Sequence, residues 1–368
     1  MGKWEMVRLG DVSTGKVTNI VQKDLTDNEG EYPIYGASGL IKNVDFYREE
    51  HPYIGVVKDG AGVGRTTLMP AKSSLIGTMQ YILPNDRVHA SYLYYAISKM
   101  NLSKFHTGAT IPHIYYKDYK SEQMPLPPLE EQQKIADILD RASTLVEKRN
   151  AQIEKLDLLV KSQFIAMFGD PITNPMGWDK KPFGITCDIT TGNTPPRANA
   201  EYYGDYIEWI KTDNIAATDS MLTTASEYLS EKGFEKCRYV ESGSILMTCI
   251  AGSLSSIGNV AITDRRVAFN QQINALTPKD YDYYFLYWLL KMMKVDIHNS
   301  VNMMLKGILS KGNLSEITAI MPPLDLQNLF ATLVTEVEKS KTQMQQALAQ
   351  QEMLYKSLMQ KCFNGEVV

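Results

Sequence analysis

Two glycine-rich loops follow apolar, strand-like runs and are the first places where chemistry is expected. Residues 53–57 lead into a loop over residues 58–65, and residues 244–248 lead into a second loop over residues 249–258. Neither loop has the G-x-x-x-x-G-K-S/T order of a phosphate-binding loop or the G-x-G-x-x-G order of a dinucleotide site. Two interpretations stay open: a tight turn between strands, or a backbone that approaches a DNA phosphate or base edge closely, because glycine adopts conformations that other residues avoid.

Side chains suited to catalysis are scattered. The sequence contains no H-E-x-x-H or G-x-S-x-G motif, and its four cysteines form no C-x-x-C pair, which is typical of free thiols in a reducing compartment. His106 and His113 flank a polar loop, but no third metal ligand recurs in the second half of the chain. Residues 174–176 match poorly the Asn-Pro-Pro-aromatic signature of amino-methyltransferases. We therefore predict no catalytic residue, no metal site and no cofactor in this chain.

Any site for a polyanion must be local, because the formal net charge is −4. Residues 1–128 contain 14 Lys and Arg against 13 Asp and Glu, and residues 171–323 contain 14 against 16. Arginine pairs with guanine edges, and asparagine or glutamine pairs with adenine edges, in the major groove of DNA. The candidate DNA-binding residues are Tyr35, Lys42, Lys58, Arg65, Thr107, His113, Lys117, Lys211, Arg265, Arg266, Asn270, Gln271 and Lys306.

The elements that must position these residues form a tandem repeat. The chain of 368 residues is long enough for two or three domains, each with its own core. Pro127-Pro128-Leu129 followed by Gln132 returns as Pro322-Pro323-Leu324 followed by Gln327, and the stretch around Lys161 returns around Lys356, in both cases 195 residues later. Each copy therefore consists of a variable segment, a Pro-Pro hinge and a constant segment of about 40 residues.

The constant segments are predicted to be long helices that pack on each other in antiparallel fashion. Apolar residues recur at three- and four-residue spacing after the prolines, and the first helix is expected to end near Gly169. About 40 residues of helix span roughly 60 Å, too much for one compact domain to cover. The alternative is that each helix lies on its own domain. The candidate residues for the helix–helix and partner interface are Ile138, Leu145, Leu156, Leu159, Leu333, Val337, Leu348 and Leu354.

The variable segments are expected to be mixed domains with short strands, which gives an α+β fold class. Residues 90–100 and 283–293 are apolar enough to be core helices, and their aromatic residues indicate packing rather than base stacking. No stretch approaches 18 uninterrupted apolar residues, and residues 1–12 are of mixed polarity. We therefore expect a cytoplasmic protein without a membrane partner.

With these features the chain resembles the specificity (S) subunit of type I restriction-modification enzymes. The motifs that carry the resemblance are W-x-x-V-R-L-G at residues 4–10, Y-P-I-Y-G-A-S-G at residues 32–39, the loop at residues 58–64, M-P-L-P-P-L-E-E-Q-Q-K-I-A at residues 124–136 and F-G-D at residues 168–170. In the second copy Asp325-Leu326-Gln327-Asn328 replaces the usual glutamates, and Phe330-Ala331 replaces Ile-Ala.

The resemblance implies a division of the chain and a function. It implies target recognition domains at residues 1–126 and 171–321, each followed by a constant helical region, at residues 127–170 and 322–368. Each recognition domain would read one half of a bipartite double-stranded DNA target, and the helix pair would set the spacer between the halves. Two modification (methyltransferase) subunits, which bind S-adenosylmethionine, would dock on the helices. Restriction subunits, which use ATP and Mg²⁺, would translocate and cut the DNA, so this chain itself is expected to be non-catalytic.

Other functions share parts of this pattern. The specificity subunit of a type IIB-like restriction-modification enzyme would have the same layout. A scaffold with a coiled coil and two peptide-binding domains would show no salt-dependent affinity for DNA. A cryptic nucleotide-binding enzyme would bind its ligand as an isolated chain.

Overall fold

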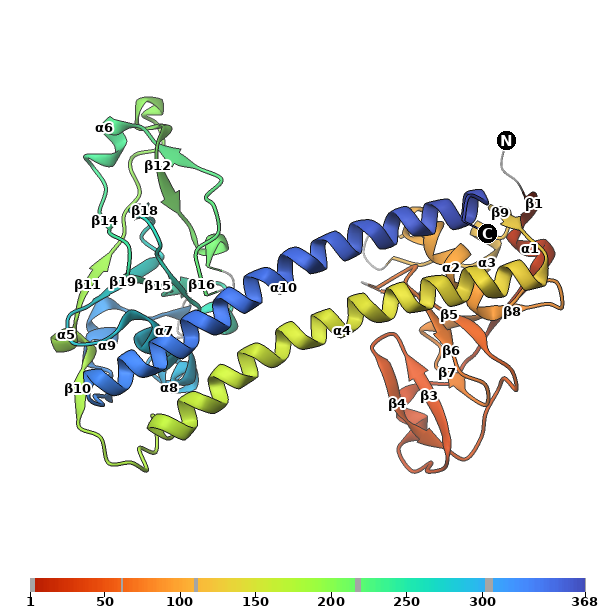
Figure 1. The fold of residues 1–368 in the computed structure, drawn as a ribbon, viewed down its shortest axis with the longest axis horizontal. Helices are drawn as coiled ribbons and strands as arrows, with labels where there is room; N and C mark the ends of the chain where they lie inside the picture. Colours follow the sequence, from red (N-terminus) through yellow and green to blue (C-terminus); the bar gives the residue numbers. More distant parts are fainter. Residues whose placement is uncertain (1–3, 61, 109–111, 216–219, 302–306, 368) are drawn as a thin grey trace. The chain divides into compact units, whose positions relative to one another are not determined.

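The chain folds into two compact units, each built from distant parts of the sequence. The computed structural model describes residues 4–60, 62–108, 112–215, 220–301 and 307–367. Unit 1 comprises Met1–Ala151 with Gln346–Val368, and unit 2 comprises Gln152–Gln345. The boundaries fall inside the two long helices, α4 (Leu129–Phe168) and α10 (Leu324–Asn364), so each unit contains one copy of the repeat and a part of both helices (Figure 1).

Unit 1 is built around a four-stranded antiparallel sheet. Its strand order is β2 (Ser13–Val17), β8 (Met79–Pro84), β5 (Tyr53–Val57) and β6 (Thr66–Met69). Every residue of β5 is buried, which explains its continuous apolar sequence. Helix α2 (Ala90–Lys99) shares a core with this sheet, in which Tyr92, Leu93 and Ile97 are fully buried.

Smaller elements complete unit 1. Strand β3 (Tyr32–Gly36) lies between β4 (Gly39–Val44), which is antiparallel to it, and β7 (Ser74–Leu75), which is parallel. Strands β1 (Glu5–Arg8) and β9 (Gln123–Leu126) pair as an antiparallel ribbon. The remaining helices are α1 (Leu9–Val12), α3 (Tyr116–Tyr119) and the 3₁₀ turns η1 (Gln22–Leu25) and η2 (Leu102–Phe105).

Unit 2 repeats this architecture. Its main antiparallel sheet has the order β11 (Cys187–Thr191), β19 (Ile273–Pro278), β15 (Ile245–Thr248) and β17 (Val260–Ile262). A second sheet has the order β13 (Tyr228–Leu229), β12 (Tyr203–Ile210), β18 (Val267–Phe269) and β14 (Tyr239–Val240). Two ribbons pair β10 (Lys180–Pro182) with β21 (Thr318–Ile320) and β16 (Ile250–Ala251) with β20 (Gly307–Ile308).

The helices of unit 2 follow the same plan. Helix α7 (Tyr283–Met292) occupies the place that α2 has in unit 1, and seven of its residues are buried. The others are α5 (Phe183–Thr186), α6 (Glu231–Phe234), α8 (Lys294–Asn299), α9 (Lys311–Glu316) and the turns η3 (Ala200–Tyr202), η4 (Thr212–Asn214) and η5 (Leu254–Ser256). The expected core helices at residues 90–100 and 283–293, and the α+β fold class, are confirmed.

The repeated glutamine after each Pro-Pro hinge fixes the long helix to its domain. In unit 1 the buried Gln132 donates to Pro127 O at 2.9 Å and accepts from His89 N, the N-cap of α2, at 2.9 Å. In unit 2 the buried Gln327 donates to Pro322 O at 2.8 Å and accepts from Asp282 N, the N-cap of α7, at 3.0 Å. The same side chain therefore satisfies the same backbone groups in both copies, which explains why the motif recurs.

Within each unit the beginning of one long helix packs with the end of the other, as predicted for an antiparallel pair. In unit 1, Ile135 and Leu139 of α4 share a core with Cys362 and Phe363 of α10. In unit 2, Phe164 of α4 lies 5.5 Å from Phe330 of α10 between ring centroids. In both units these residues also belong to the core of the adjoining domain. The two interpretations of the apolar stripe are therefore both realised, because the helix ends cover a domain and a partner helix at once.

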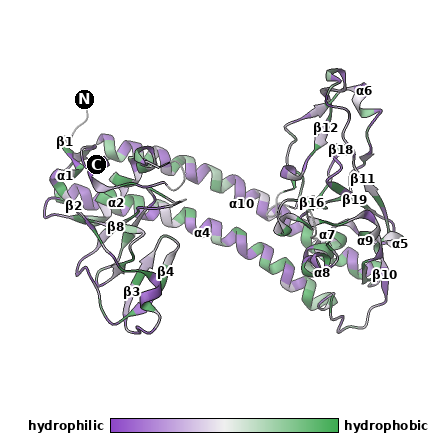
Figure 2. Ribbon diagram, turned by 180° about the vertical axis from the view of Figure 1, so that it is seen from behind, coloured by the Kyte–Doolittle hydropathy of each residue, from purple (hydrophilic) through white to green (hydrophobic). Residues whose placement is uncertain are grey.

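The structure divides the eight predicted interface residues into two groups. Ile138, Leu333 and Val337 are partly buried against the two cores, and Leu156 and Leu348 are half-buried. Leu145, Leu159 and Leu354 are exposed, with 57%, 44% and 68% of their surface accessible. Hydrophobic and hydrophilic residues alternate along both helices (Figure 2). Among the described helices, none is both long enough and apolar enough to cross a membrane.

Candidate nucleic-acid interface

The two glycine-rich loops occupy the same place in their units. Gly64 donates to Val57 O in unit 1, and Gly258 donates to Thr248 O in unit 2, both at 2.9 Å. Both glycines have a positive φ, of 82° and 77°. A Cβ on Gly64 would lie 2.6 Å from the backbone nitrogen of Ser103, so only glycine fits there. Each loop is thus a closed turn between antiparallel strands, β5 to β6 and β15 to β17, as the first of the two interpretations expects.

The next backbone contacts of the loops also correspond. Lys58 N donates to Thr78 O at 2.9 Å, and Cys249 N donates to Gln272 O at 2.8 Å. An isolated bridge joins Asp59 to His113 in unit 1, where unit 2 has the ribbon of β16 with β20. Residues 58–64 and residues 249–258 therefore connect equivalent strand ends in the two units, and the second loop is three residues longer than the first.

In unit 1 the loop gathers three of the predicted residues. His113 Nδ1 lies 2.7 Å from Asp59 Oδ1, and Lys58 Nζ lies 3.4 Å from Asp59 Oδ2. Thr107 and His113 exchange two backbone hydrogen bonds, of 2.8 and 2.9 Å. The side chain of Lys58 is 16% exposed and that of His113 is 39% exposed. We call Lys58, Asp59, Thr107 and His113 the loop cluster; it offers several hydrogen-bond donors around one carboxylate.

Two further candidates of unit 1 are exposed side chains near chain turns. Lys117, on α3, is exposed, and its ammonium lies 5.5 Å from the ring centroid of Tyr115. Arg65 closes the first loop and is exposed, and its guanidinium donates to Ala37 O. Both keep their positive charge at the surface without an ion pair in the described part of the chain.

The other two candidates of unit 1 support the β3–β4 sheet. Tyr35 is half-buried and packs against the cluster that contains Tyr53 and Tyr81. Lys42 is half-buried, and its ammonium donates to Leu25 O at 3.0 Å. The structure does not bring these two residues into the loop cluster.

The basic candidates of unit 2 are paired with acids. Lys211 Nζ lies 2.5 Å from Glu227 Oε1, and Arg266 Nη2 lies 2.6 Å from Glu241 Oε1. The guanidinium of Arg265 binds both carboxylate oxygens of Glu208. The hydrogen bond from Arg265 lowers the pKa of Glu208, and the hydrogen bond from Lys211 is the main cause that lowers the pKa of Glu227. These cations are thus neutralised within the domain, which the local sequence does not indicate.

The amide candidates of unit 2 differ in exposure. Asn270 is 5% exposed, because its side chain bonds back to the next-but-one residue, Gln272, rather than facing solvent. Its amide is therefore not presented to a base edge, in contrast to the expectation. Gln271 is exposed and accepts a hydrogen bond from the hydroxyl of Thr194. Lys306 lies outside the described residues.

Sequence reasoning missed a polar cavity beside the second loop. It has a volume of about 380 Å³ and is lined by Asp213, Thr248 and Gln272, among others. Sequence position could have indicated these residues, because Thr248 ends the strand that leads into the loop and Gln272 directly follows the candidates Asn270 and Gln271.

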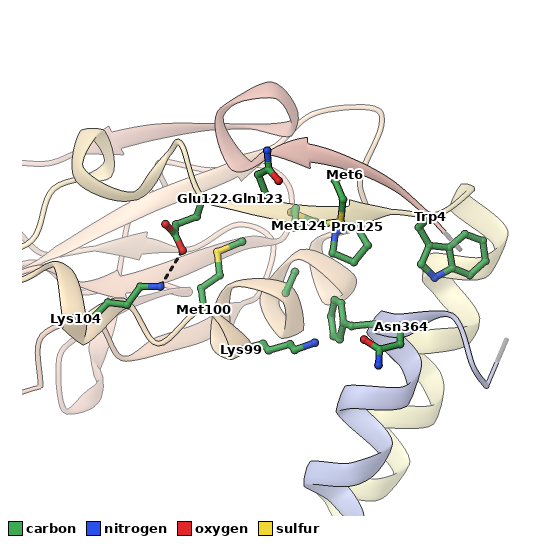
Figure 3. A pocket seen from close by; sticks show the side chains of 12 residues that line it. Trp4, Met6, Lys99, Met100, Lys104, Glu122, Gln123, Met124, Pro125 and Asn364 are labelled. Carbon is green, nitrogen blue, oxygen red and sulfur yellow. Dashed lines mark hydrogen bonds and ion pairs between the residues drawn. The ribbon is translucent and has the colours of Figure 1, made fainter. Parts of the chain in front are cut away.

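A second cavity lies in unit 1, beside the ribbon of β1 with β9. It has a volume of about 430 Å³, and Figure 3 shows Trp4 and Asn364 at one end and the ion pair of Lys104 with Glu122 at the other. Desolvation lowers the pKa of Lys99, whose ammonium lies 5.1 Å from the ring centroid of Phe363. None of the predicted DNA-binding residues lines this cavity.

The described residues contain no group of three or more His, Cys, Asp or Glu side chains that can hold a metal ion. Burial raises the pKa of the Cys249 thiol, at the start of the second loop, to about 12, so this thiol is not activated as a nucleophile. The chemistry that the loops offer is hydrogen bonding and charge.

Comparison with known proteins places this fold in a family. A sequence model described as "Type I restriction modification DNA specificity domain" matches residues 1–155 and 175–351. The type I restriction enzyme MjaIX specificity subunit of Methanocaldococcus jannaschii is 25% identical over 278 residues, which cover 69% of this chain and 63% of that protein. The HindI specificity subunit of Haemophilus influenzae is 29% identical over 180 residues, which cover 44% of this chain and 36% of that protein. The matches thus span less than two thirds of these two curated relatives.

The fold has a counterpart among solved structures. The S subunit of a type I restriction-modification system from M. genitalium superposes with a TM-score of 0.63 at 17% identity, covering 98% of this chain and 96% of that one. The family match covers both copies of the repeat and nine tenths of the sequence. The chain therefore belongs to the family of type I restriction-modification DNA specificity domains.

Proposed function

We propose that this chain is the non-catalytic specificity subunit of a type I restriction-modification enzyme, and that each unit reads one half of a bipartite DNA target. The observation that carries the proposal is the family match over both copies, combined with loops of one backbone frame that present different side chains. Two recognition units with the same backbone contacts but different side chains suit two different short DNA sequences.

The loop cluster and the exposed cations are the contacts that we propose for unit 1. Lys58 and His113 supply donors for phosphate or base edges, and Arg65 and Lys117 add exposed positive charge beside them. In unit 2 the basic candidates are already paired with acids, so we assign them to the stability of the domain and to contacts at its surface. In unit 2 we therefore look for base recognition in polar groups other than these paired cations.

The long helices are proposed to set the spacer and to bind the partners. Each is an unbroken helix of 40 or 41 residues that begins in one unit and ends in the other. Exposed apolar side chains remain on both, and in the part that belongs to unit 1 these are Leu129, Leu145, Met353 and Leu354. Apolar groups left exposed in this way suit a protein partner. We assign them to the modification subunits, which supply S-adenosylmethionine, and through these to the restriction subunits, which use ATP and Mg²⁺.

The test is co-expression with the modification subunit, followed by mapping of methylated adenines on host DNA. The expected result is methylation at a two-part motif with a fixed gap. Host DNA from cells without this chain should carry no methylation at these sites. A purified, active complex that methylates no two-part motif would contradict the proposal and favour a scaffold that does not bind DNA.

The docking surface is tested separately with Leu145→Asp. Since Leu145 is 57% exposed, the substitution is expected to leave the fold intact and to reduce co-purification of the modification subunit at least tenfold. The matched control is Thr144→Asp, which adds the same charge at an exposed neighbour about 100° around the helix. Unchanged co-purification of the Leu145→Asp variant would remove this face of α4 from the docking surface.

A further inference from the structure

The polar cavity of unit 2 is lined by groups that form hydrogen bonds, and no cation is among the described residues of its lining. The polar residues around its volume of about 380 Å³ are Thr212, Asp213, Thr248, Ser256, Asn259 and Gln272. Among the described residues, Asp213 is the only charged one in the lining, where it is exposed and forms no hydrogen bond or ion pair with another described residue. A carboxylate with no Lys or Arg among the described lining residues disfavours phosphate and favours a ligand that presents hydrogen-bond donors.

Thr248 lines this cavity and carries a hydroxyl that is itself buried. The residue is 1% exposed, and its Oγ1 has no hydrogen-bond partner in the described part of the structure. The backbone oxygen of Thr248 accepts from Gly258 N, as that of Val57 accepts from Gly64 N in unit 1. Val57 is therefore the equivalent residue, and its side chain has the same shape without a hydroxyl. A buried hydroxyl without a partner destabilises the free protein, so stability alone does not explain a threonine at this position.

Two amides of the cavity are held in fixed orientations. Asn270 Nδ2 donates to Gln272 Oε1 at 3.1 Å, and Gln272 N donates to Asn270 Oδ1 at 3.0 Å. Lys294 Nζ donates to Asn259 Oδ1 at 2.6 Å, which leaves the NH₂ group of Asn259 for another acceptor. Gln272 Nε2 also donates to Ile250 O at 3.5 Å, which leaves one N–H and one oxygen lone pair of this amide for a ligand. Asn270 is thus a positioning residue for Gln272, which accounts for its burial.

The geometry points to a base edge as the ligand. We propose that this cavity receives the major-groove edge of a base with an exocyclic amino group, adenine or cytosine, in the half-site that unit 2 reads. A glutamine amide pairs with N6 and N7 of adenine, and a carboxylate accepts from N4 of cytosine. Gln272 therefore recognises adenine if that base is present, and Asp213 recognises cytosine. This inference rests on the proposed function and names the ligand of one of its two sites.

The position of the cavity agrees with this assignment. Gln272 O accepts from the first residue of the second loop, as Thr78 O does in unit 1. The cavity therefore lies where unit 1 has its loop cluster, although the side chains are unrelated. The same position carries polar side chains in both units, but the side chains differ. This is expected if the two units bind different DNA sequences.

The experiment compares three variants in the complex with modification subunits. Gln272→Ala, Asp213→Asn and Thr248→Val are each used to select bound duplexes from a library with both half-sites randomised. Discrimination at one base pair of one half-site is expected to fall about 5- to 150-fold, the range of one good pair of contacts, while the other half-site stays unchanged. Loss at an A·T pair with Gln272→Ala identifies adenine, and loss at a C·G pair with Asp213→Asn identifies cytosine.

The controls separate this inference from a folding defect and from the proposed function. Asp280→Asn makes the same charge change at an exposed site of unit 2 and should leave the motif intact. Thr248→Val should melt at the same or a higher temperature than the wild type, because it removes an unpaired hydroxyl. A two-part motif that all three variants retain overturns this inference and leaves the proposed function standing. A wild-type complex without a two-part motif overturns both.

Discussion

The loop of unit 1 and the loop of unit 2 share backbone contacts but present different side chains. Where unit 1 has Lys58 and the bridge of Asp59 with His113, unit 2 has Cys249 and the pairing of Ile250 with Ile308. The shared backbone depends on main-chain hydrogen bonds and on the glycine with positive φ that closes each loop, Gly64 or Gly258. Side chains at the site are therefore free to change without a change of fold, which is what a family that reads many DNA sequences requires.

The helix ends differ between the units in a second way. In unit 2, Phe164, Phe168, Phe285 and Phe330 form one aromatic cluster with centroid distances of 4.7 to 5.5 Å. The equivalent residues of unit 1 are Met359, Phe363, Tyr92 and Ile135, in the same order. The three helix positions are offset by 195 residues, and Tyr92 of the domain is offset from Phe285 by 193. The same contact is thus made mainly by aromatic side chains in one unit and by a mixed set in the other.

The largest expected effect comes from breaking the aromatic cluster. Phe164→Ala should destabilise unit 2 by about 3–5 kcal/mol, because Phe164 is fully buried and touches three other rings. Met359→Ala, at the half-buried equivalent position, should cost unit 1 only about 1–2 kcal/mol. Native-state hydrogen exchange, followed by mass spectrometry, measures the two units separately. Equal losses of protection in the two units would show that the aromatic cluster contributes nothing special.

The next effect tests a feature that the units share. Gln327→Ala should destabilise unit 2, and Gln132→Ala unit 1, by about 1–3 kcal/mol each, because each change leaves buried backbone groups without partners. The control is Gln350→Ala, an exposed glutamine of α10, for which less than about 0.5 kcal/mol is expected. The same exchange experiment measures all three, and clearly unequal effects of the two buried glutamines would break the equivalence of the hinges.

The parts that the sequence predicted are those that depend on local pattern. The long helices, the strands at 53–57 and 244–248 and the core helices follow from apolar periodicity, and α4 ends at Phe168, one residue before Gly169 as expected. The pairing of Arg265 with Glu208 was not predictable, because 57 residues separate them and strand β12 brings Glu208 to β18 only in the folded sheet. Asn270 was predicted as a DNA contact from its residue type, and its burial and its hydrogen bond to Gln272 could not be predicted from the sequence.

The third prediction concerns the charged loop. Lys58→Ala should weaken DNA binding by about 1–3 kcal/mol if the ammonium makes one strong contact, and should reduce the slope of log K against log salt by about one. Lys72→Ala is the matched control, since Lys72 is an exposed lysine of unit 1 outside the loop cluster. Binding is measured at several salt concentrations with the complex on its own methylation motif. An affinity and a salt slope that stay at wild-type values would assign Lys58 to the structure of the loop alone.

The smallest effect separates the outer sheets of the two units. In unit 2 the sheet is held by the ion pair of Glu208 with Arg265, whereas in unit 1 Lys42 bonds to backbone oxygens instead. Glu208→Gln should destabilise unit 2 by about 1 kcal/mol at neutral pH, since both partners are partly accessible to solvent.

That difference should depend on pH in one direction. The hydrogen bond from Arg265 lowers the pKa of Glu208 in the folded state, so the pair stabilises the fold above the usual carboxyl range, near pH 4.3, and loses this effect as the pH falls through the lowered pKa. The wild type and the variant should therefore converge once the pH has fallen below the lowered pKa of Glu208. Exchange of the β12 amides, corrected for the intrinsic pH dependence, measures this. Glu241→Gln, in the exposed pair with Arg266, should differ less from the wild type in stability at neutral pH. If the stability difference between Glu208→Gln and the wild type persists in acid, shape rather than charge links β12 to β18.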